Sequence, residues 1–223
     1  MLLKRNKIKR KSNLDLLDTL IRLGLFLIAL ALLLFIVIFC PVVIKEIEYK
    51  LSKPSKNMVV LAPKSSSIGV TNEGKEIVPV DEDFSIVVPK IKANSKVISD
   101  VDPYDSKIYQ KELTKGVAHA KGSVYPGQVG NSFYFAHSSD NFYNANRYNS
   151  VFYLLNKLEE GDLFYFSYKE ELFKYKVVQT KIVESESINY LSGKTNRKLA
   201  TLMTCWPAGT TLKRLVVVGE LVE

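Results

Sequence analysis

A cysteine and an arginine in the C-terminal part of the chain have the residue types and spacing of covalent chemistry. In TLMTCWPAGTTLKRLVV, residues 201 to 217, Cys205 is followed nine residues later by Arg214. A thiolate is a strong nucleophile, and an arginine keeps its charge to stabilise the oxyanion that forms when the thiolate attacks a carbonyl. LATLMTC and LKRLVVVGELV are typical of two strands joined by WPAGTT, so both residues are expected near the same end of a hairpin.

A cysteine nucleophile also needs an imidazole with which to exchange its proton, and the chain has two histidines. His137 follows the alternating strand pattern SFYFA and precedes the polar loop SSDN. Strand ends beside loops are where a rigid sheet presents side chains to a substrate. His119 lies among small and loop-forming residues in GVAHAKGSVYPG. His137 is therefore favoured as the partner of Cys205.

Each of these residues also has an ordinary structural interpretation. A lone cysteine at a strand end is commonly a small buried hydrophobe, and an arginine in a strand commonly lies on the surface. The other cysteine, Cys40, lies in an apolar run, so Cys205 is expected to be a free thiol. The combination of thiol, imidazole and guanidinium favours an enzyme, but residue types alone leave both interpretations open.

The elements that must position these residues begin with a membrane anchor. Residues 23–44, LGLFLIALALLLFIVIFCPVVI, are 22 residues without a charge, and about 20 apolar residues span a bilayer as a helix. The basic tail 1–22 is expected on the cytoplasmic side, which places the rest of the chain outside the cell. A cleaved signal peptide is the alternative, but the apolar run is long and no small-x-small site follows it. Cys40 also lacks the small residues that precede a lipoprotein cysteine.

The basic charge of the chain comes mainly from this tail. Residues 1–22 hold seven basic and two acidic side chains, which contribute +5 of the net +8. The other +3 is spread over the rest of the chain without a basic patch, so nucleic acid is not an expected partner.

The remaining chain divides into a lead-in and one domain. Residues 45–80 mix charge, Pro, Ser and Gly, and are expected to form a stalk or linker. Residues 81–223 contain many short runs rich in β-branched and aromatic residues, separated by turn residues, which predicts a mainly β barrel or sandwich. Short helices are expected around 106–115 and 151–158. The two histidines are not spaced as metal ligands, so no metal site is predicted, and no cofactor is expected.

Taken together, these residues resemble the sortases, the membrane-anchored cysteine transpeptidases of mainly Gram-positive cell surfaces. The family carries T-L-x-T-C at a strand end with an arginine about nine residues on, and Thr201-Leu202-Met203-Thr204-Cys205 with Arg214 matches it. The segment GVAHAKGSVYPGQVGNSFYFAHSS resembles the family's Pro-Gly loop and the strand that delivers the catalytic histidine. The resemblance covers about residues 83–221.

The resemblance implies a closed eight-stranded β-barrel and a sorting-signal transpeptidase. Cys205 would be the nucleophile, His137 the general acid and base, and Arg214 the donor to oxyanion and substrate. Leu202, Thr204 and His119 would contact the substrate or support those residues, with a loop-ordering role expected for His119. The family cleaves LPxTG-like signals through a thioester and transfers the protein to an amine of a cell-wall precursor or a pilin subunit.

Some features depart from the family pattern. The family's strand often ends in Gly-His-Arg-Thr, whereas here it reads Ala136-His137-Ser138-Ser139. Asp102-Pro103-Tyr104 resembles the lid of pilin-polymerising sortases, but its place after the first strand predicts a turn. Trp206-Pro207 and the short loop to Arg214 resemble class D or E members. A tethered β domain that binds without turnover is the main alternative, and an L,D-transpeptidase is disfavoured because its Ser-His-Gly-type motif is missing.

Overall fold

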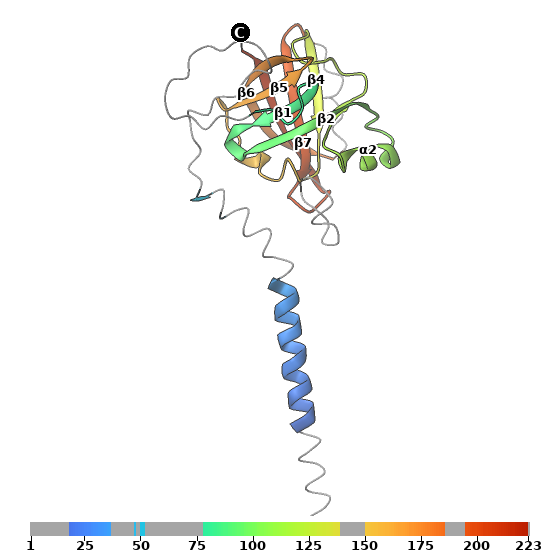
Figure 1. The fold of residues 1–223 in the computed structure, drawn as a ribbon, viewed down its shortest axis with the longest axis vertical. Helices are drawn as coiled ribbons and strands as arrows, with labels where there is room; N and C mark the ends of the chain where they lie inside the picture. The colour runs from blue at the N-terminus through green and yellow to red at the C-terminus, as the bar shows by residue number, and fades with distance from the viewer. Residues whose placement is uncertain are drawn as a thin grey trace, which may run out of the picture. The chain divides into compact units, whose positions relative to one another are not determined.

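The structure, a computed structural model, describes residues 18–36, 47, 50–51, 78–138, 150–185 and 195–222 (Figure 1). The chain divides into two compact units, Met1–Lys53 and Pro54–Glu223, which are described separately.

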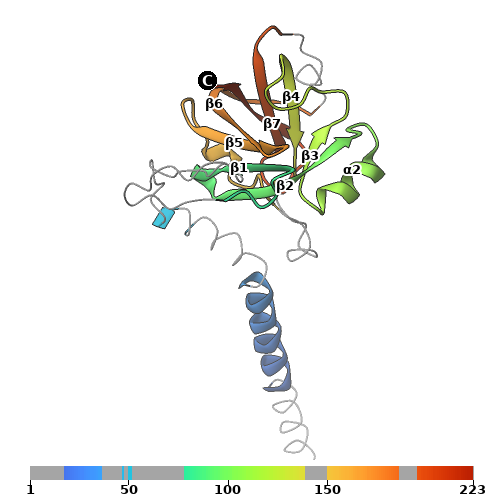
Figure 2. The same cartoon turned by 45° about the horizontal axis from the view of Figure 1, so that its top comes forward.

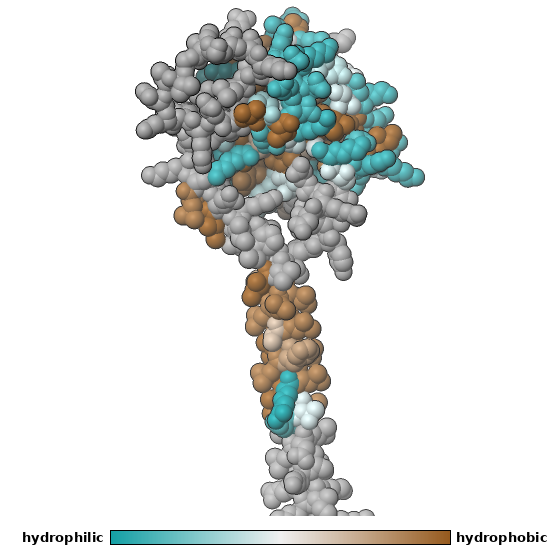
Figure 3. All heavy atoms as spheres, in the orientation of Figure 1, coloured by the Kyte–Doolittle hydropathy of each residue, from teal (hydrophilic) through white to brown (hydrophobic). Residues whose placement is uncertain are grey.

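The described part of the first unit is dominated by one apolar helix, Asp18–Ile36, with 19 residues and a mean hydropathy of 2.6. Figure 3 shows its visible face hydrophobic apart from a hydrophilic region near one end. At that end the guanidinium of Arg22 pairs with the carboxylate of Asp18 at 2.8 Å. The helix begins five residues before the predicted span 23–44, and residues 37–44 lie outside the described residues. Its length and composition suffice to cross a membrane, a property that signal sequences share.

The second unit contains a closed barrel of eight strands, which confirms the expected fold. The strands are β1 (Phe84–Val88), β2 (Ala93–Val101), β3 (Val117–Ala120), β4 (Gly130–Phe135), β5 (Leu163–Tyr168), β6 (Glu171–Glu184), β7 (Lys198–Trp206) and β8 (Lys213–Leu221). Around the barrel they follow the order β1-β2-β3-β4-β7-β8-β6-β5. The β2–β3 and β4–β7 pairs are parallel and the others antiparallel. The β4–β7 pair brings together segments about 70 residues apart in sequence.

Short helices connect some of the strands. The predicted helix at 106–115 is α2 (Ser106–Leu113), and the carboxylate of Asp105 caps it by accepting from the backbone N–H groups of residues 107 and 108. The one expected at 151–158 is reduced to a single 3₁₀ turn, η2 (Leu155–Lys157), and a second such turn is η1 (Pro89–Ile91). The tripeptide at 102–104 forms a turn before α2, as expected, with the backbone N–H of Tyr104 donating to the carboxylate of Asp102.

Aromatic side chains fill the barrel interior. Tyr134 of β4 stacks on Phe166 of β5 with ring centroids 4.1 Å apart, and Phe164 stacks on Tyr175 of β6 at 5.5 Å. These side chains are fully buried. Gly219 of β8 faces the same rings, because a Cβ at this position would lie 2.4 Å from the ring of Phe164. The absence of a side chain at 219 therefore makes room for the aromatic core.

A second apolar layer lies outside the barrel, under α2. Its buried members are Val101, Leu113, Ala118, Ala120, Phe133 and Phe135, and Ile98, Tyr109 and Met203 pack against them. Figure 2 shows α2 beside the strands β2 and β3. This layer covers the outer face of the sheet near the C-terminal end of β4.

We expect Gly219→Ala to destabilise the second unit by about 1–3 kcal/mol, because the added methyl group overpacks the ring of Phe164. Thermal unfolding of the purified chain measures the change. Phe164→Leu in the same chain removes the clashing ring atoms and should recover part of the loss. If the losses of stability in the two single variants simply add up in the double variant, this account of the close packing is contradicted.

Candidate active site

Cys205 and Arg214 lie directly opposite each other on neighbouring strands. They are Cα partners in the antiparallel β7–β8 pair, and both are partly exposed. Directly opposed residues of two strands share a face of the sheet. The adjacent pair, Thr204 and Leu215, is buried in the barrel. The thiol and the guanidinium therefore lie on the outer face, as the hairpin pattern predicts.

His137 comes to the other side of Cys205 from β4. The last pair of the parallel β4–β7 register is Phe135 with Met203, and the N–H of Ala136 donates to the carbonyl of Met203 at 3.2 Å. Continuing this register by two residues would bring His137 level with Cys205 on the same face. The predicted imidazole and thiol therefore belong to adjacent chain segments.

The next strand extends the same row. Val183 of β6 is the Cα partner of Arg214. Cys205, Arg214 and Val183 thus follow one another across β7, β8 and β6 at one level of the barrel. The segment that carries His137 follows β4 on the other side of β7. Neighbouring strands are about 4.8 Å apart, so the strand of Arg214 and the segment of His137 both lie next to the strand of the thiol.

Thr204 connects the two segments that carry His137 and Cys205. Its side chain is 3% exposed, and its hydroxyl donates to the carbonyl of Ala136 at 2.8 Å. The residue before the nucleophile therefore holds the residue before the histidine. Residue types indicated that Thr204 matters but not this contact, which depends on the long-range pairing of β4 with β7.

The guanidinium of Arg214 is held by the loop that precedes it. Its Nη1 group donates to the carbonyls of Thr211 and Lys213 at 3.0 and 3.1 Å. The N–H groups of Nε and Nη2 have no acceptor within the described part of the chain. They are the donors that remain for a carbonyl oxygen bound beside Cys205.

Burial lowers the pKa of His137, because its half-buried ring is partly removed from water. The imidazole is therefore mainly neutral at neutral pH. A neutral ring can accept a proton from a thiol or from an incoming amine, as a general base must.

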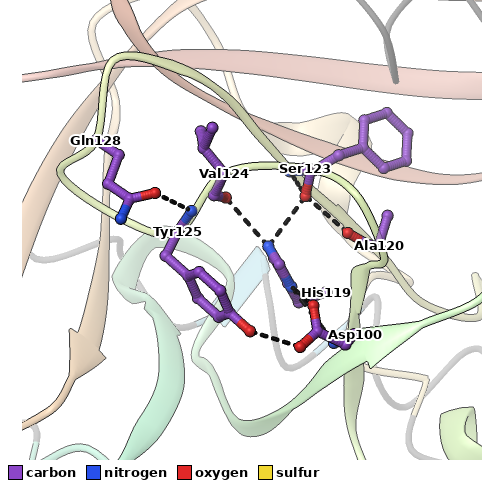
Figure 4. Close-up of polar contacts among 8 residues, drawn as sticks. Asp100, His119, Ala120, Ser123, Val124, Tyr125 and Gln128 are labelled. Atoms are coloured by element: carbon purple, nitrogen blue, oxygen red, sulfur yellow. Dashed lines mark hydrogen bonds and ion pairs between the residues drawn. The ribbon is translucent and has the colours of Figure 1, made fainter.

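His119 lies elsewhere, inside the barrel on β3, where it is the partner of Tyr134 in the β3–β4 pair and is 0% exposed. Its Nε2 lies 3.1 Å from the carbonyl of Val124 and 3.0 Å from the hydroxyl of Ser123 (Figure 4). Because a carbonyl can only accept, Nε2 carries the proton. Its Nδ1 faces the backbone N–H of Asp100 at 3.5 Å, which suits the unprotonated nitrogen of a neutral ring.

Ser123, His119 and Asp100 follow one another in the order of a serine-protease triad, yet their hydrogen bonds exclude that chemistry. A general base needs a free lone pair on Nε2, which here carries a proton directed at a carbonyl. The hydroxyl of Ser123 donates to the carbonyl of Ala120 at 2.8 Å and accepts from the N–H of Phe133. The cluster therefore orders the loop between β3 and β4.

The other predicted site residues are also located. Leu202 is fully buried in the barrel interior, so it does not present its side chain to a peptide on the outer face. Among the residues that the structure describes, no group of three His, Cys, Asp or Glu side chains is arranged to hold a metal ion.

The buried ring of His119 predicts an acid-sensitive stability. Burial lowers its pKa below the value of about 6.5 for an unfolded histidine, so the unfolded chain binds a proton that the folded chain excludes. Its contribution to stability is fully present above about pH 6.5 and is lost as the pH falls toward the folded pKa.

Thermal unfolding between pH 5 and 8 tests this expectation. His119→Asn should flatten the fall in Tm below pH 6.5, whatever its effect at pH 8. His137→Asn is the matched control for the half-buried ring, whose pKa burial also lowers. If Tm falls below pH 6.5 as steeply in His119→Asn as in the unmodified chain, the assignment of this effect to His119 is contradicted.

Comparisons with known proteins agree with this geometry. Residues 86–222 match the family model described as Sortase domain. Sortase D of Bacillus subtilis is 28% identical over 138 residues, which cover 60% of this chain and 61% of Sortase D. Sortase A of Listeria monocytogenes is 34% identical over 65 residues, 29% of each chain. The chain thus spans less than two thirds of the length of these curated relatives.

Solved structures show the same architecture. The crystal structure of sortase C-1 from Actinomyces oris has a TM-score of 0.54 and 31% identity, with 65% of this chain and 76% of that chain covered. Sortase A from Corynebacterium diphtheriae has a TM-score of 0.53 and 27% identity, covering 63% and 60%. With a family match over more than half of its length and an eight-stranded barrel of the same architecture, the chain belongs to the sortase family.

Proposed function

We propose that the protein is a cysteine transpeptidase that cleaves an LPxTG-like sorting signal and transfers the released acyl group to an amine. The observation that carries this proposal is the direct pairing of Cys205 with Arg214, together with the bond from Ala136 to Met203 that brings the segment of His137 to the other side of β7. In the proposed site a nucleophile lies between an acid/base and a permanent cation, as acyl transfer requires. Membership of the sortase family supports the reaction class.

In the first half-reaction, the sulfur of Cys205 attacks the carbonyl carbon of the scissile Thr-Gly bond. The oxyanion accepts hydrogen bonds from the N–H groups of Arg214 that its loop leaves available. The C–N bond breaks, the proton that left the thiol passes from His137 to the departing amine, and a thioester remains on Cys205.

In the second half-reaction, an amine attacks the thioester carbonyl, and its proton passes to His137 as the C–N bond forms. Arg214 stabilises the second oxyanion in the same position. The new C–N bond forms as the C–S bond breaks, and the proton returns to the thiolate of Cys205. The number of protons and bonds is conserved, so no oxidant, metal or nucleotide is needed for turnover.

The proposed substrates are secreted proteins that carry a sorting signal, and the proposed acceptor is an amine of a cell-wall precursor or a pilin subunit. A structure of Clostridium perfringens sortase C is described with the C-terminal cell wall sorting motif, and it is 29% identical with a TM-score of 0.52. That likeness covers 62% of this chain and 69% of that chain, and it supports a peptide substrate of the same class.

The proposed arrangement of the chain follows its composition. Residues 1–22 form a cytoplasmic tail, 23–44 a single membrane span, 45–80 a stalk and 81–223 the extracellular catalytic domain. The apolar helix Asp18–Ile36 supports the anchor, and the cluster of basic residues before it supports the orientation.

The reaction is tested with the full chain in detergent, an LPxTG-type peptide and an amine acceptor. Cys205→Ala should abolish cleavage, and Arg214→Ala should lower kcat/KM by roughly 100-fold or more, as for loss of an oxyanion donor. Arg214→Lys keeps the charge but loses the planar fork, so its activity should fall between those of Arg214→Ala and the unmodified chain. Cleavage that survives Cys205→Ala would refute the proposal, and peptide binding without turnover would support the binding-domain alternative.

The contact between Thr204 and Ala136 makes a separate prediction. Thr204→Val keeps the shape of the side chain but removes the hydroxyl that donates to the carbonyl of Ala136, leaving a buried acceptor unpaired. A cost of about 1–3 kcal/mol applies to such a group, so a loss of activity of about tenfold is expected through misplacement of His137.

Thr204→Ser is the matched control because it retains the hydroxyl, and its activity should stay within about threefold of the unmodified chain. Equal activities for the Val and Ser variants would show that the hydrogen bond is not needed. The peptide cleavage assay measures both variants.

A further inference from the structure

Tyr109 of α2 lies over the sheet next to the proposed catalytic row. Its ring meets that of Phe135 edge to face, with centroids 6.0 Å apart and planes at 83°. Tyr109 and Met203 pack against the same apolar cluster that contains Phe135. Phe135 and Met203 are the last register pair of β4 and β7, two residues before His137 and Cys205.

Small side chains on β3 allow this contact. Phe135 has Ala118 as its Cα partner on β3. Ala118 and Ala120 are completely buried in the cluster under α2. Because alanine side chains are small, the Tyr109 ring can reach across β3 to β4, the strand that precedes His137. These pairs make Ala118, Phe135 and Met203 neighbours across β3, β4 and β7. Along the chain, Phe135 and Met203 come two residues before the proposed catalytic residues.

The helix that carries Tyr109 is anchored at its start. The carboxylate of Asp105 accepts hydrogen bonds from the backbone N–H groups of Lys107 and Ile108 at 2.9 and 3.2 Å. Leu113, at the other end of the helix, is buried in the same cluster. A capped helix with a buried end provides a firm support for one aromatic ring.

His137 lies beyond the end of β4, so its position depends on what holds the last residues of that strand. The N–H of Ala136 and the hydroxyl of Thr204 hold it from the β7 side. Tyr109 presses on Phe135 from the outer face. We propose that Tyr109 is a positioning residue that holds the ends of β4 and β7 in register, and thereby holds the imidazole of His137 beside the thiol of Cys205.

This inference rests on the proposed function for its effect on turnover but not for its effect on the thiol. The reactivity of Cys205 toward iodoacetamide depends on its thiolate fraction, which a neighbouring imidazole changes. The pH dependence of alkylation therefore reports how His137 and Cys205 are placed, whether or not a sorting signal is the substrate. Mass spectrometry of the peptide that contains Cys205 distinguishes it from Cys40.

The experiment compares four variants of the full chain in detergent. Tyr109→Ala should lower kcat for peptide cleavage about tenfold with KM within about threefold, and should move the alkylation profile toward that of His137→Ala. Tyr109→Phe keeps the ring and should match the unmodified chain in both measurements. Ile108→Ala changes a neighbouring side chain of the same helix that is 47% exposed, and should also match it.

The outcomes separate the two proposals. An unmodified chain that does not cleave sorting signals would refute the proposed function, and the alkylation profiles would still test Tyr109. If Tyr109→Ala lowers Tm but leaves the alkylation profile unchanged, the residue is merely structural and the inference is overturned. Should Tyr109→Ala fail to fold, Tyr109→Leu takes its place, and a wild-type profile for that variant with normal kcat would equally overturn the inference.

Discussion

The parallel pairing of β4 with β7 is the constraint on which the rest of the site depends. It joins segments about 70 residues apart, and its register brings the segment that carries His137 to the strand of Cys205. A shift by one residue would turn His137 to the opposite face of the sheet, because side chains alternate along a strand. The backbone bond from Ala136 to Met203 and the hydroxyl of Thr204 hold this register where the strand ends.

Packing inside the barrel and packing in the apolar layer outside it both stabilise that register. The interior is filled by stacked aromatic rings, and β8 brings a glycine to the place where the ring of Phe164 lies. The outer layer under α2 covers the sheet only up to Phe135, so the row at His137 and Cys205 stays partly open to solvent. Stability is thus supplied next to the reactive groups, while the groups themselves remain accessible to a peptide.

The two histidines show how environment rather than residue type decides function. Burial lowers the pKa of both rings. His119 has both nitrogens engaged by its own loop and by the backbone of β2, in a tautomer that leaves no lone pair for a reacting proton. His137 follows the end of β4 and is partly exposed, and it is the imidazole proposed to act on the thiol. The same imidazole therefore orders a loop in one place and can exchange protons in the other.

The amino-acid sequence alone determined the local features of this protein. The apolar helix, the β-rich domain, the helix at residues 106–115, and the hairpin that pairs Cys205 with Arg214 are encoded in short-range patterns of hydrophobicity, turns and caps. The strand pattern that ends before His137 and the family resemblance also indicated this histidine. The tertiary structure decided what depends on long-range pairing: the register that brings the segment of His137 to the strand of Cys205, the bond from Thr204 to Ala136, and the contact of Tyr109 with Phe135. The inward orientation of Leu202 and the enclosed cluster around His119 also followed from closure of the barrel. The reason is that hydrophobic periodicity specifies which face of a strand is buried, whereas partners distant in sequence are selected only when the barrel closes and its aromatic core packs.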